Sequence, residues 1–91
     1  MSVTVRIPTQ LRNLSGNAAE VQVEASTVAE ALKALDSAHP GFEERLFDES
    51  GGLRRFVNVF LADEDIRFLQ GIDTVVEPGQ VVSIIPAVAG G

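Results

Sequence analysis

Few side chains in this sequence are suited to catalysis. The 91 residues include no cysteine and a single histidine, His39. The missing thiol excludes a disulfide framework, a cysteine nucleophile, a zinc knuckle and an iron–sulfur cluster held by the chain's own thiolates. A site with two histidine ligands is impossible, and a Ser-His-Asp triad would have to use His39. We therefore expect no catalytic residue, and we assign His39 to complementing the carbonyl groups at the end of a helix.

A short acidic cluster is the candidate for a cation site. Asp63, Glu64 and Asp65 follow one another in the sequence. Carboxylates bind hard cations, but this spacing lacks the pattern of a calcium loop. A solvated turn explains the same residues, so we expect no metal site here. Arg54 and Arg55 are the expected ion-pair partners of this cluster or of another protein.

The C-terminal segment is the most informative part of the chain. Residues 86–91 are Pro-Ala-Val-Ala-Gly-Gly. Pro86 has no N–H to donate and therefore ends a strand, and the small residues after it cannot pack a core. We expect a flexible tail that projects into solvent. Gly90 and Gly91 have no Cβ, so this end can lie extended in a narrow channel, although an ordinary frayed terminus is the alternative interpretation.

The first half of the chain predicts two strands and a helix. Residues 3–7 and 19–25 alternate between apolar and polar side chains, as half-buried strands do, and the polar connection between them indicates a hairpin. After Thr27 the apolar residues follow helical spacing. They are Val28, Ala31, Leu32 and Leu35. Thr27 and Glu30 are spaced as in a capping box, and Pro40-Gly41 ends the helix.

The second half predicts a further helical turn and three strands. In order, these are a turn of helix at 42–47, a central strand at 53–61, a short edge strand at 66–68, a turn at 77–80 and the last strand at 81–85. This order of elements predicts an α+β fold, with one main helix across one face of a mixed sheet. A chain of this length forms a single domain, residues 1–91.

Alternation along the central strand assigns its two faces. We expect Val57, Val59 and Leu61 to face the helix and Phe56 and Phe60 to lie on the open face, although the opposite assignment fits the pattern nearly as well. Aromatic side chains on a half-covered sheet are candidates for burial against another protein. Phe56 and Phe60 are therefore the predicted partner surface.

The charge of the chain excludes two kinds of partner. Seven Lys and Arg residues against 13 Asp and Glu residues give a net charge of -6. Such a charge repels a nucleic-acid backbone and an anionic membrane surface. Residues 1–10 lack the apolar core of a signal peptide, and no stretch approaches the ~18 apolar residues of a membrane span. We expect a cytoplasmic protein that binds neither nucleic acid nor membrane.

Several of these features together resemble the ubiquitin-like (β-grasp) sulfur carriers of the MoaD/ThiS family. The resemblance lies in the order of the elements, in the turn and strand of residues 77–86 and in the ending Val-Ala-Gly-Gly at 88–91. Residues 56–59 (Phe-Val-Asn-Val), residues 63–68 and the ending are most similar to the branch that supplies sulfur for cysteine synthesis. The resemblance covers essentially the whole chain and implies a β-grasp fold with a C-terminal Gly-Gly tail.

The resemblance implies a protein co-substrate and not an enzyme. A carboxylate is a poor electrophile, so an E1-like adenylyltransferase/sulfurtransferase would use ATP to activate the Gly91 carboxylate. A sulfur donor would then convert it to a thiocarboxylate. Val88, Ala89 and Gly90 would enter the active sites of the partner enzymes. The resemblance also implies a sulfur-accepting synthase, here a pyridoxal-phosphate enzyme that makes cysteine, and no cofactor bound by the chain itself.

Three other interpretations stay open. Carriers of similar sequence supply sulfur to molybdopterin, thiamin or specialised metabolites. A ubiquitin-like modifier would attach Gly91 to lysines of other proteins. A plain β-grasp interaction module would have the same fold and an inert tail.

Overall fold

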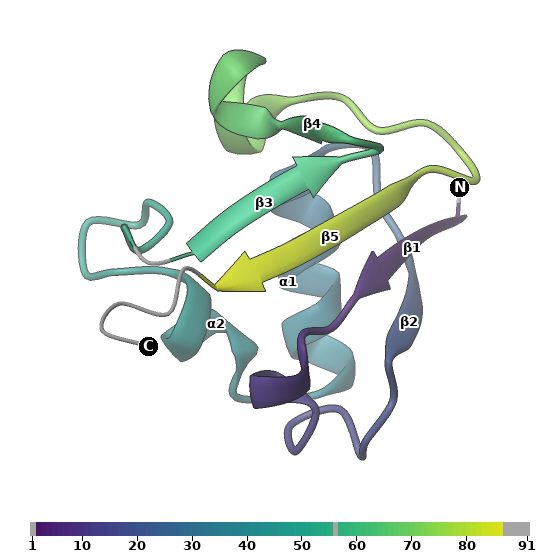
Figure 1. The fold of residues 1–91 in the computed structure, drawn as a ribbon, viewed down its shortest axis with the longest axis vertical. Coiled ribbons are helices and arrows are strands. Elements are labelled where there is room, and N and C mark those ends of the chain that lie inside the picture. The colour runs from purple at the N-terminus through teal and green to yellow at the C-terminus, as the bar shows by residue number, and fades with distance from the viewer. Residues whose placement is uncertain (1, 56, 87–91) are drawn as a thin grey trace.

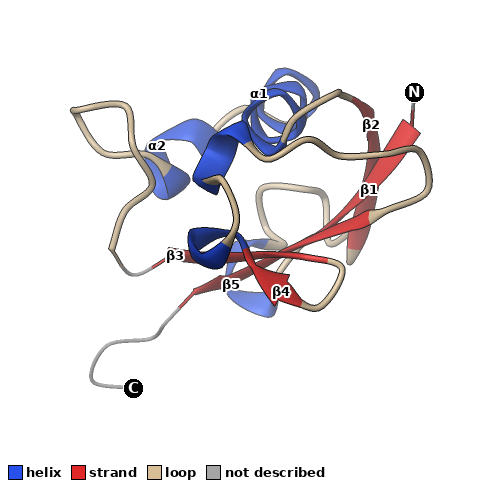
Figure 2. Ribbon diagram, turned by 90° about the horizontal axis from the view of Figure 1, so that it is seen from above, coloured by secondary structure: helices blue, strands red, loops and turns tan. Residues whose placement is uncertain are grey.

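The structure is a computed structural model that describes residues 2–55 and 57–86. Its elements are β1 (Ser2–Arg6), η1 (Thr9–Leu11), β2 (Glu20–Glu24), α1 (Val28–Ala38), α2 (Phe42–Leu46), β3 (Val57–Leu61), β4 (Glu64–Asp65), η2 (Ile66–Phe68), η3 (Gly71–Asp73) and β5 (Val81–Pro86). The five strands form one sheet in the order β2-β1-β5-β3-β4 (Figure 1). Helices α1 and α2 lie on the same side of this sheet (Figure 2). This arrangement confirms the predicted α+β, β-grasp fold.

The sheet is mixed, and its middle strand is the last one in the sequence. β1 pairs antiparallel with β2, which confirms the predicted hairpin, and parallel with β5. β3 pairs antiparallel with both β5 and β4. The prediction that β3 is the central strand was therefore wrong: β5 is central and β3 is its neighbour, because β5 inserts between β1 and β3.

The ends of α1 follow from local sequence. The Thr27 hydroxyl accepts the N–H of Glu30 at 3.2 Å, and the Glu30 carboxylate accepts the N–H of Ser26 at 2.9 Å. These two bonds confirm the predicted capping residues, with the carboxylate reaching one residue further back than in a standard capping box. After the helix, Gly41 adopts a φ of +114°. This left-handed conformation suits glycine, and it turns the chain from α1 into α2.

The core lies between α1 and the sheet. The apolar residues of α1 with helical spacing are all buried, as are Phe42 and Leu46 of α2. The sheet contributes buried side chains from β1, β2, β3 and β5: Val3, Val5, Val23, Val57, Val59, Leu61, Val82 and Ile84. Val57, Val59 and Leu61 thus face the helix as predicted, and Phe60 is half-buried on the opposite face. Phe56 lies outside the described residues.

Two strand predictions were wrong in extent or type. The predicted strand at 53–61 begins only at Val57, because the segment before it packs against α2: Leu53 forms an isolated bridge with Phe47, and the Arg54 N–H donates to the Leu46 carbonyl at 2.8 Å. The predicted edge strand at 66–68 is the 3-10 helix η2, and the edge strand is β4. The chain forms η2 after Asp65, and not a strand, because the Asp65 carboxylate caps the first turn of η2.

The remaining predictions concern the chain ends and the membrane. The predicted turn at 77–80 is present, with the Gln80 N–H donating to the Glu77 carbonyl at 3.1 Å, and β5 follows it. Of the predicted tail, the described residues include only Pro86, the last residue of β5. No helix within 2–55 and 57–86 is both long and apolar enough to cross a bilayer.

Candidate functional site

The predicted functional residues follow the end of β5, where the predicted tail begins. Pro86 lies opposite Val57 of β3 in the antiparallel ladder. β1 pairs with β5 only up to Ser83, so the last residues of β5 have a single strand neighbour in the described chain. The predicted sulfur-attachment residue Gly91 and the predicted tail residues Val88, Ala89 and Gly90 lie outside the described residues. The structure therefore describes the strand that precedes them in the sequence.

The open sheet face beside this end combines apolar and polar side chains. Phe60 pairs with Ser83, and Asn58 pairs with Ile85, so these four residues share the face that α1 does not cover. Ile85 is 47% exposed, and Phe60 is half-buried. Sequence analysis selected Phe60 but missed Ile85, because a last strand rich in Val and Ile gives no sign of which side chains stay uncovered.

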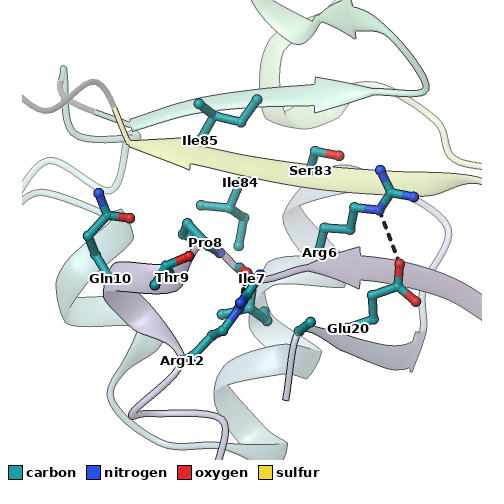
Figure 3. A pocket seen from close by; sticks show the side chains of 11 residues that line it. Arg6, Ile7, Pro8, Thr9, Gln10, Arg12, Glu20, Ser83, Ile84 and Ile85 are labelled. Carbon is teal, nitrogen blue, oxygen red and sulfur yellow. Dashed lines mark hydrogen bonds and ion pairs between the residues drawn. The ribbon is translucent and has the colours of Figure 1, made fainter. Parts of the chain in front are cut away.

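A hollow of about 530 Å³ adjoins Ile85 on the same side of the sheet (Figure 3). It lies between the ends of β1 and β5, η1 and the start of β2, and its lining includes Arg6, Thr9, Gln10, Arg12, Glu20, Ser83 and Ile85. Arg6 Nε lies 3.1 Å from Glu20 Oε2, and Arg12 Nε donates to the Ile7 carbonyl at 3.1 Å. Two guanidinium groups, two hydroxyls and one amide face a single carboxylate. The hollow suits polar or acidic side chains of another protein, and its lining provides no nucleophile paired with a base.

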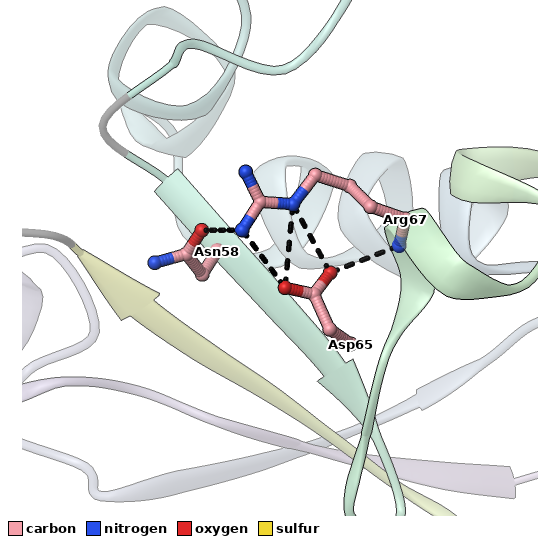
Figure 4. A network of polar contacts seen from close by, with 3 residues as sticks. All are labelled: Asn58, Asp65 and Arg67. Atoms are coloured by element: carbon pink, nitrogen blue, oxygen red, sulfur yellow. Dashed lines mark hydrogen bonds and ion pairs between the residues drawn. The ribbon is translucent and has the colours of Figure 1, made fainter.

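A second polar group lies on β3 and η2 (Figure 4). Arg67 Nη2 donates to Asp65 Oδ2 at 2.8 Å and to Asn58 Oδ1 at 2.7 Å, and Arg67 Nε lies 3.3 Å from each oxygen of Asp65. Hydrogen bonds from the Arg67 guanidinium and, next, from its backbone N–H lower the pKa of Asp65 below its ordinary value. The same contact raises the pKa of Arg67.

This contact corrects the expectation for Asp65 alone, since Asp63 lies in an exposed turn as predicted and Glu64 is exposed on β4. Asp65 is buried and paired, and it is not part of a solvated turn. Its partner is Arg67, whereas Arg54 uses its Nε to donate to the Glu44 carbonyl at 3.0 Å. The sequence signal that was available is the two-residue spacing of Asp65 and Arg67, which suits an aspartate that caps a helical turn and holds a nearby cation.

No metal site is formed by the described residues. Within 2–55 and 57–86, no three His, Asp or Glu side chains are arranged to hold a metal ion. His39 directly follows α1, and its backbone N–H donates to the Leu35 carbonyl at 2.8 Å. The role predicted for its imidazole at the helix end stays a prediction.

Comparison with known proteins assigns the class. The model of the ThiS family matches residues 5–91. The chain belongs to the ThiS family of ubiquitin-like sulfur carriers. It is therefore a sulfur carrier, a small protein on which partner enzymes act, and it is not itself an enzyme.

Within this class the chain is similar to one named carrier over its whole length. It is 44% identical over 93 residues to the sulfur carrier protein CysO of Mycobacterium tuberculosis, with all of both chains covered. A chain in the crystal structure of the Amycolatopsis orientalis BexX/CysO complex superposes with a TM-score of 0.91 at 44% identity, covering 98% of this chain and 99% of that one. SAMP1 from Haloferax volcanii superposes with a TM-score of 0.85 at 29% identity, with both chains fully covered. These matches confirm the predicted family and show a full-length similarity to carriers named CysO.

Proposed function

We propose that this chain carries sulfur as a thiocarboxylate on Gly91 and supplies it for cysteine synthesis. The observation that carries the proposal is the full-length similarity to CysO together with a family match that extends to Gly91. The position of β5 supports it, because this strand lies in the middle of the sheet, paired with β1 up to Ser83 and with β3 up to Pro86. A strand in this position would fix the point from which a tail leaves the folded domain to enter another protein.

The chemistry requires two steps before sulfur can leave. A carboxylate oxygen of Gly91 attacks the α-phosphate of ATP, which forms an acyl adenylate and releases pyrophosphate. Sulfide then attacks the acyl carbon and displaces AMP, which leaves the thiocarboxylate. An E1-like adenylyltransferase would catalyse these steps, and the chain contributes only its carboxylate. ATP and sulfide are the partner's substrates, and a cytoplasmic location follows from that use of ATP.

The length and composition of the tail fit this role. Five residues follow Pro86, and an extended segment of five residues spans about 17 Å. That length allows Gly91 to reach a buried active site while the folded domain stays outside. Val88, Ala89 and Gly90 would line the entrance channel, and their small side chains limit the width that the channel needs.

The proposed partner surface is the open sheet face next to the end of β5. Phe60 and the 47%-exposed Ile85 are apolar side chains at diagonal positions of the β3–β5 ladder on this face, and the hollow containing Arg6 and Arg12 adjoins Ile85. An apolar centre with a polar rim is the usual anatomy of a protein interface. Phe56 belongs to the same proposal from its sequence position.

The proposed acceptor is a pyridoxal-phosphate synthase that makes cysteine. The thiocarboxylate sulfur would attack an activated serine-type substrate, displace its leaving group and form a carrier–cysteinyl adduct, which a protease then releases. The Amycolatopsis orientalis CysO occurs in a BexX/CysO complex, which supports a carrier that binds a partner protein directly. Other sulfur acceptors use the same thiocarboxylate, so the acceptor is identified by its product.

Intact-mass measurement tests the proposal. Incubation with an activating enzyme, ATP and a sulfide source should exchange one oxygen for one sulfur, and the mass change should map to Gly91. Addition of a cysteine synthase with its activated substrate should give the cysteinyl adduct. If no cognate activator produces either change, the chain is an interaction module with an inert tail.

A second candidate function is protein modification. The similarity to SAMP1 and the 35% identity over 66 residues to small archaeal modifier protein 3 of Haloferax volcanii favour it. A modifier would join Gly91 to lysines through isopeptide bonds. Ladders of conjugates in cell extract, without a small-molecule adduct, would replace the sulfur-donor proposal with this one.

A further inference from the structure

β3 has a strand neighbour along only part of its outer edge. β5 pairs with all of β3, from Val57 to Leu61, whereas β4 pairs only with Phe60 and Leu61. Figure 1 shows β4 beside the arrowhead of β3 and not along its first half. In the described part of the chain, residues 57–59 therefore have no strand on the side away from β5.

The backbone groups on this edge can be assigned from the ladder. Along a strand, successive residues direct their N–H and C=O groups to opposite sides. The Ala62 N–H donates to the Val81 carbonyl on β5 at 3.0 Å, so the odd-numbered residues Val57 and Val59 direct theirs to the outer edge. The Val57 N–H donates to the Arg54 carbonyl at 2.9 Å. The Val57 carbonyl and the Val59 N–H are the groups that an added strand would bond.

A hollow of about 210 Å³ borders this edge, and its charge is opposite to that of the whole chain. Its lining is Leu53, Arg54, Arg55, Val57, Val59, Asp65, Ile66 and Arg67. Three guanidinium groups thus face one carboxylate, in a protein whose net charge is -6. Figure 4 shows the guanidinium of Arg67 reaching over β3 to Asn58. An acidic ligand is the one that this local charge attracts.

From these observations we infer that the outer edge of β3 binds an extended, acidic segment of another protein. The segment adds to the sheet as a strand beside residues 57–59 and places carboxylates against Arg54, Arg55 and Arg67. Strand addition supplies affinity through main-chain hydrogen bonds, and guanidinium–carboxylate pairs supply selectivity. Because Val57 lies opposite Pro86, the segment lies one strand away from the end of β5. A protein that takes up the tail can therefore also contact the outer edge of β3, although binding at this edge does not depend on tail chemistry.

The charges also decide against a second copy of the chain as the occupant. Two copies paired through this edge would bring their arginine groups together, and like charges across an interface weaken association. The same arginine groups attract an acidic segment.

A peptide titration tests the inference on the full chain. The probe is a fluorescent peptide of alternating valine and glutamate, followed by anisotropy and by amide NMR. We expect saturable binding, shift changes centred on Val57 to Val59 and slower hydrogen exchange of the Val59 N–H. A peptide of the same charge with an N-methyl group on every residue has no backbone N–H to donate, so it cannot bond as a strand and should fail to bind.

Two charge reversals complete the test. Arg55→Glu should weaken binding by about tenfold or more, because it replaces attraction with repulsion at the edge. Lys33→Glu, at an exposed position on α1 outside this hollow, makes the same change in net charge and should leave binding unchanged. The inference is overturned if the peptide does not bind, if the N-methylated peptide binds equally well, or if both reversals have the same effect.

Discussion

The carboxylate of Asp65 binds Arg67 through both its backbone and its side chain. It accepts the backbone N–H at 2.9 Å and the Nη2 of the guanidinium at 2.8 Å. The same guanidinium reaches Asn58 on β3, so one aspartate starts η2 and ties it to the neighbouring strand. This network ends β4 after two residues, and the short β4 leaves the outer edge of β3 open.

The first prediction concerns the pH dependence of stability. Hydrogen bonds from Arg67 hold the pKa of Asp65 below the ordinary value of 3.8. A group with a lower pKa in the folded state stabilises the fold above its ordinary pKa, and this stabilisation is lost as the pH falls through the folded-state pKa. The wild type should therefore exceed Asp65→Asn in free energy of unfolding near neutral pH, and the difference should shrink toward about pH 2. Urea denaturation over this range measures it.

Comparison of the two proteins isolates Asp65 from other carboxylates. The pKa of Asp48 is also lowered, first by the hydroxyl and then by the backbone N–H of Ser50, and it contributes in the same direction in both proteins. A difference between wild type and Asp65→Asn that stays constant from neutral to acidic pH would contradict the assigned role of Arg67.

The second prediction concerns the turn between α1 and α2. Gly41 has a φ of +114°, and a Cβ added there would lie 3.1 Å from Leu14 Cδ2. Gly41→Ala should therefore cost about 1–2 kcal/mol in free energy of unfolding. Gly52 is the matched control, because its φ is not in the left-handed region and its nearest neighbour would be Ser50 Oγ at 3.8 Å. Equal stability of the two alanine variants would show that the turn does not depend on glycine.

Local chemistry explains which parts of the fold the sequence predicts. The capping residues Thr27 and Glu30, the turn at Gly41 and the apolar stripe of α1 depend on residues a few positions apart. Alternation along β3 divided its residues between two faces, but it left open which face meets the helix, because each set contains large apolar side chains. Each of these features is a property of one segment.

Features that depend on distant segments were not predictable in this way. The position of β3 depends on where β5 inserts, and that is set by a parallel pairing between the two ends of the chain. The hollow next to Ile85 is built by residues from β1, η1, β2 and β5, which no spacing rule connects. The edge strand was misassigned because one hydrogen bond from Arg67 to Asp65 outweighed the apolar pattern of residues 66–68.

The third prediction separates the core from the proposed partner surface. Phe42 is fully buried, so Phe42→Ala should cost about 3–5 kcal/mol in stability. Phe60 is half-buried on the open face, so Phe60→Ala should cost about 1 kcal/mol. If this face docks partners, Phe60→Ala should also weaken binding to the activating enzyme by about tenfold.

Both quantities are needed on the same protein. Thermal or urea denaturation gives the stability, and calorimetric titration with the activating enzyme gives the affinity. Unchanged affinity of a folded Phe60→Ala variant would remove Phe60 from the partner surface and leave Ile85 to be tested in the same way.

The last prediction concerns the tail. The ladders and the buried core lie within residues 2–86, so removal of Gly91 should leave the melting temperature unchanged. The shortened chain presents Gly90 as its carboxylate, one residue short of the proposed reacting position, and thiocarboxylate formation should be abolished.

A second variant, Gly90→Val, keeps the length but adds a branched side chain next to the reacting carboxylate, and it should slow the reaction by steric exclusion from a narrow channel. Intact mass after incubation with activator, ATP and sulfide measures both, with Glu77→Gln on an exposed turn as the control. Full activity of the shortened chain would show that the reacting carboxylate is not that of Gly91, whereas loss of the fold would show that the tail contributes to the core.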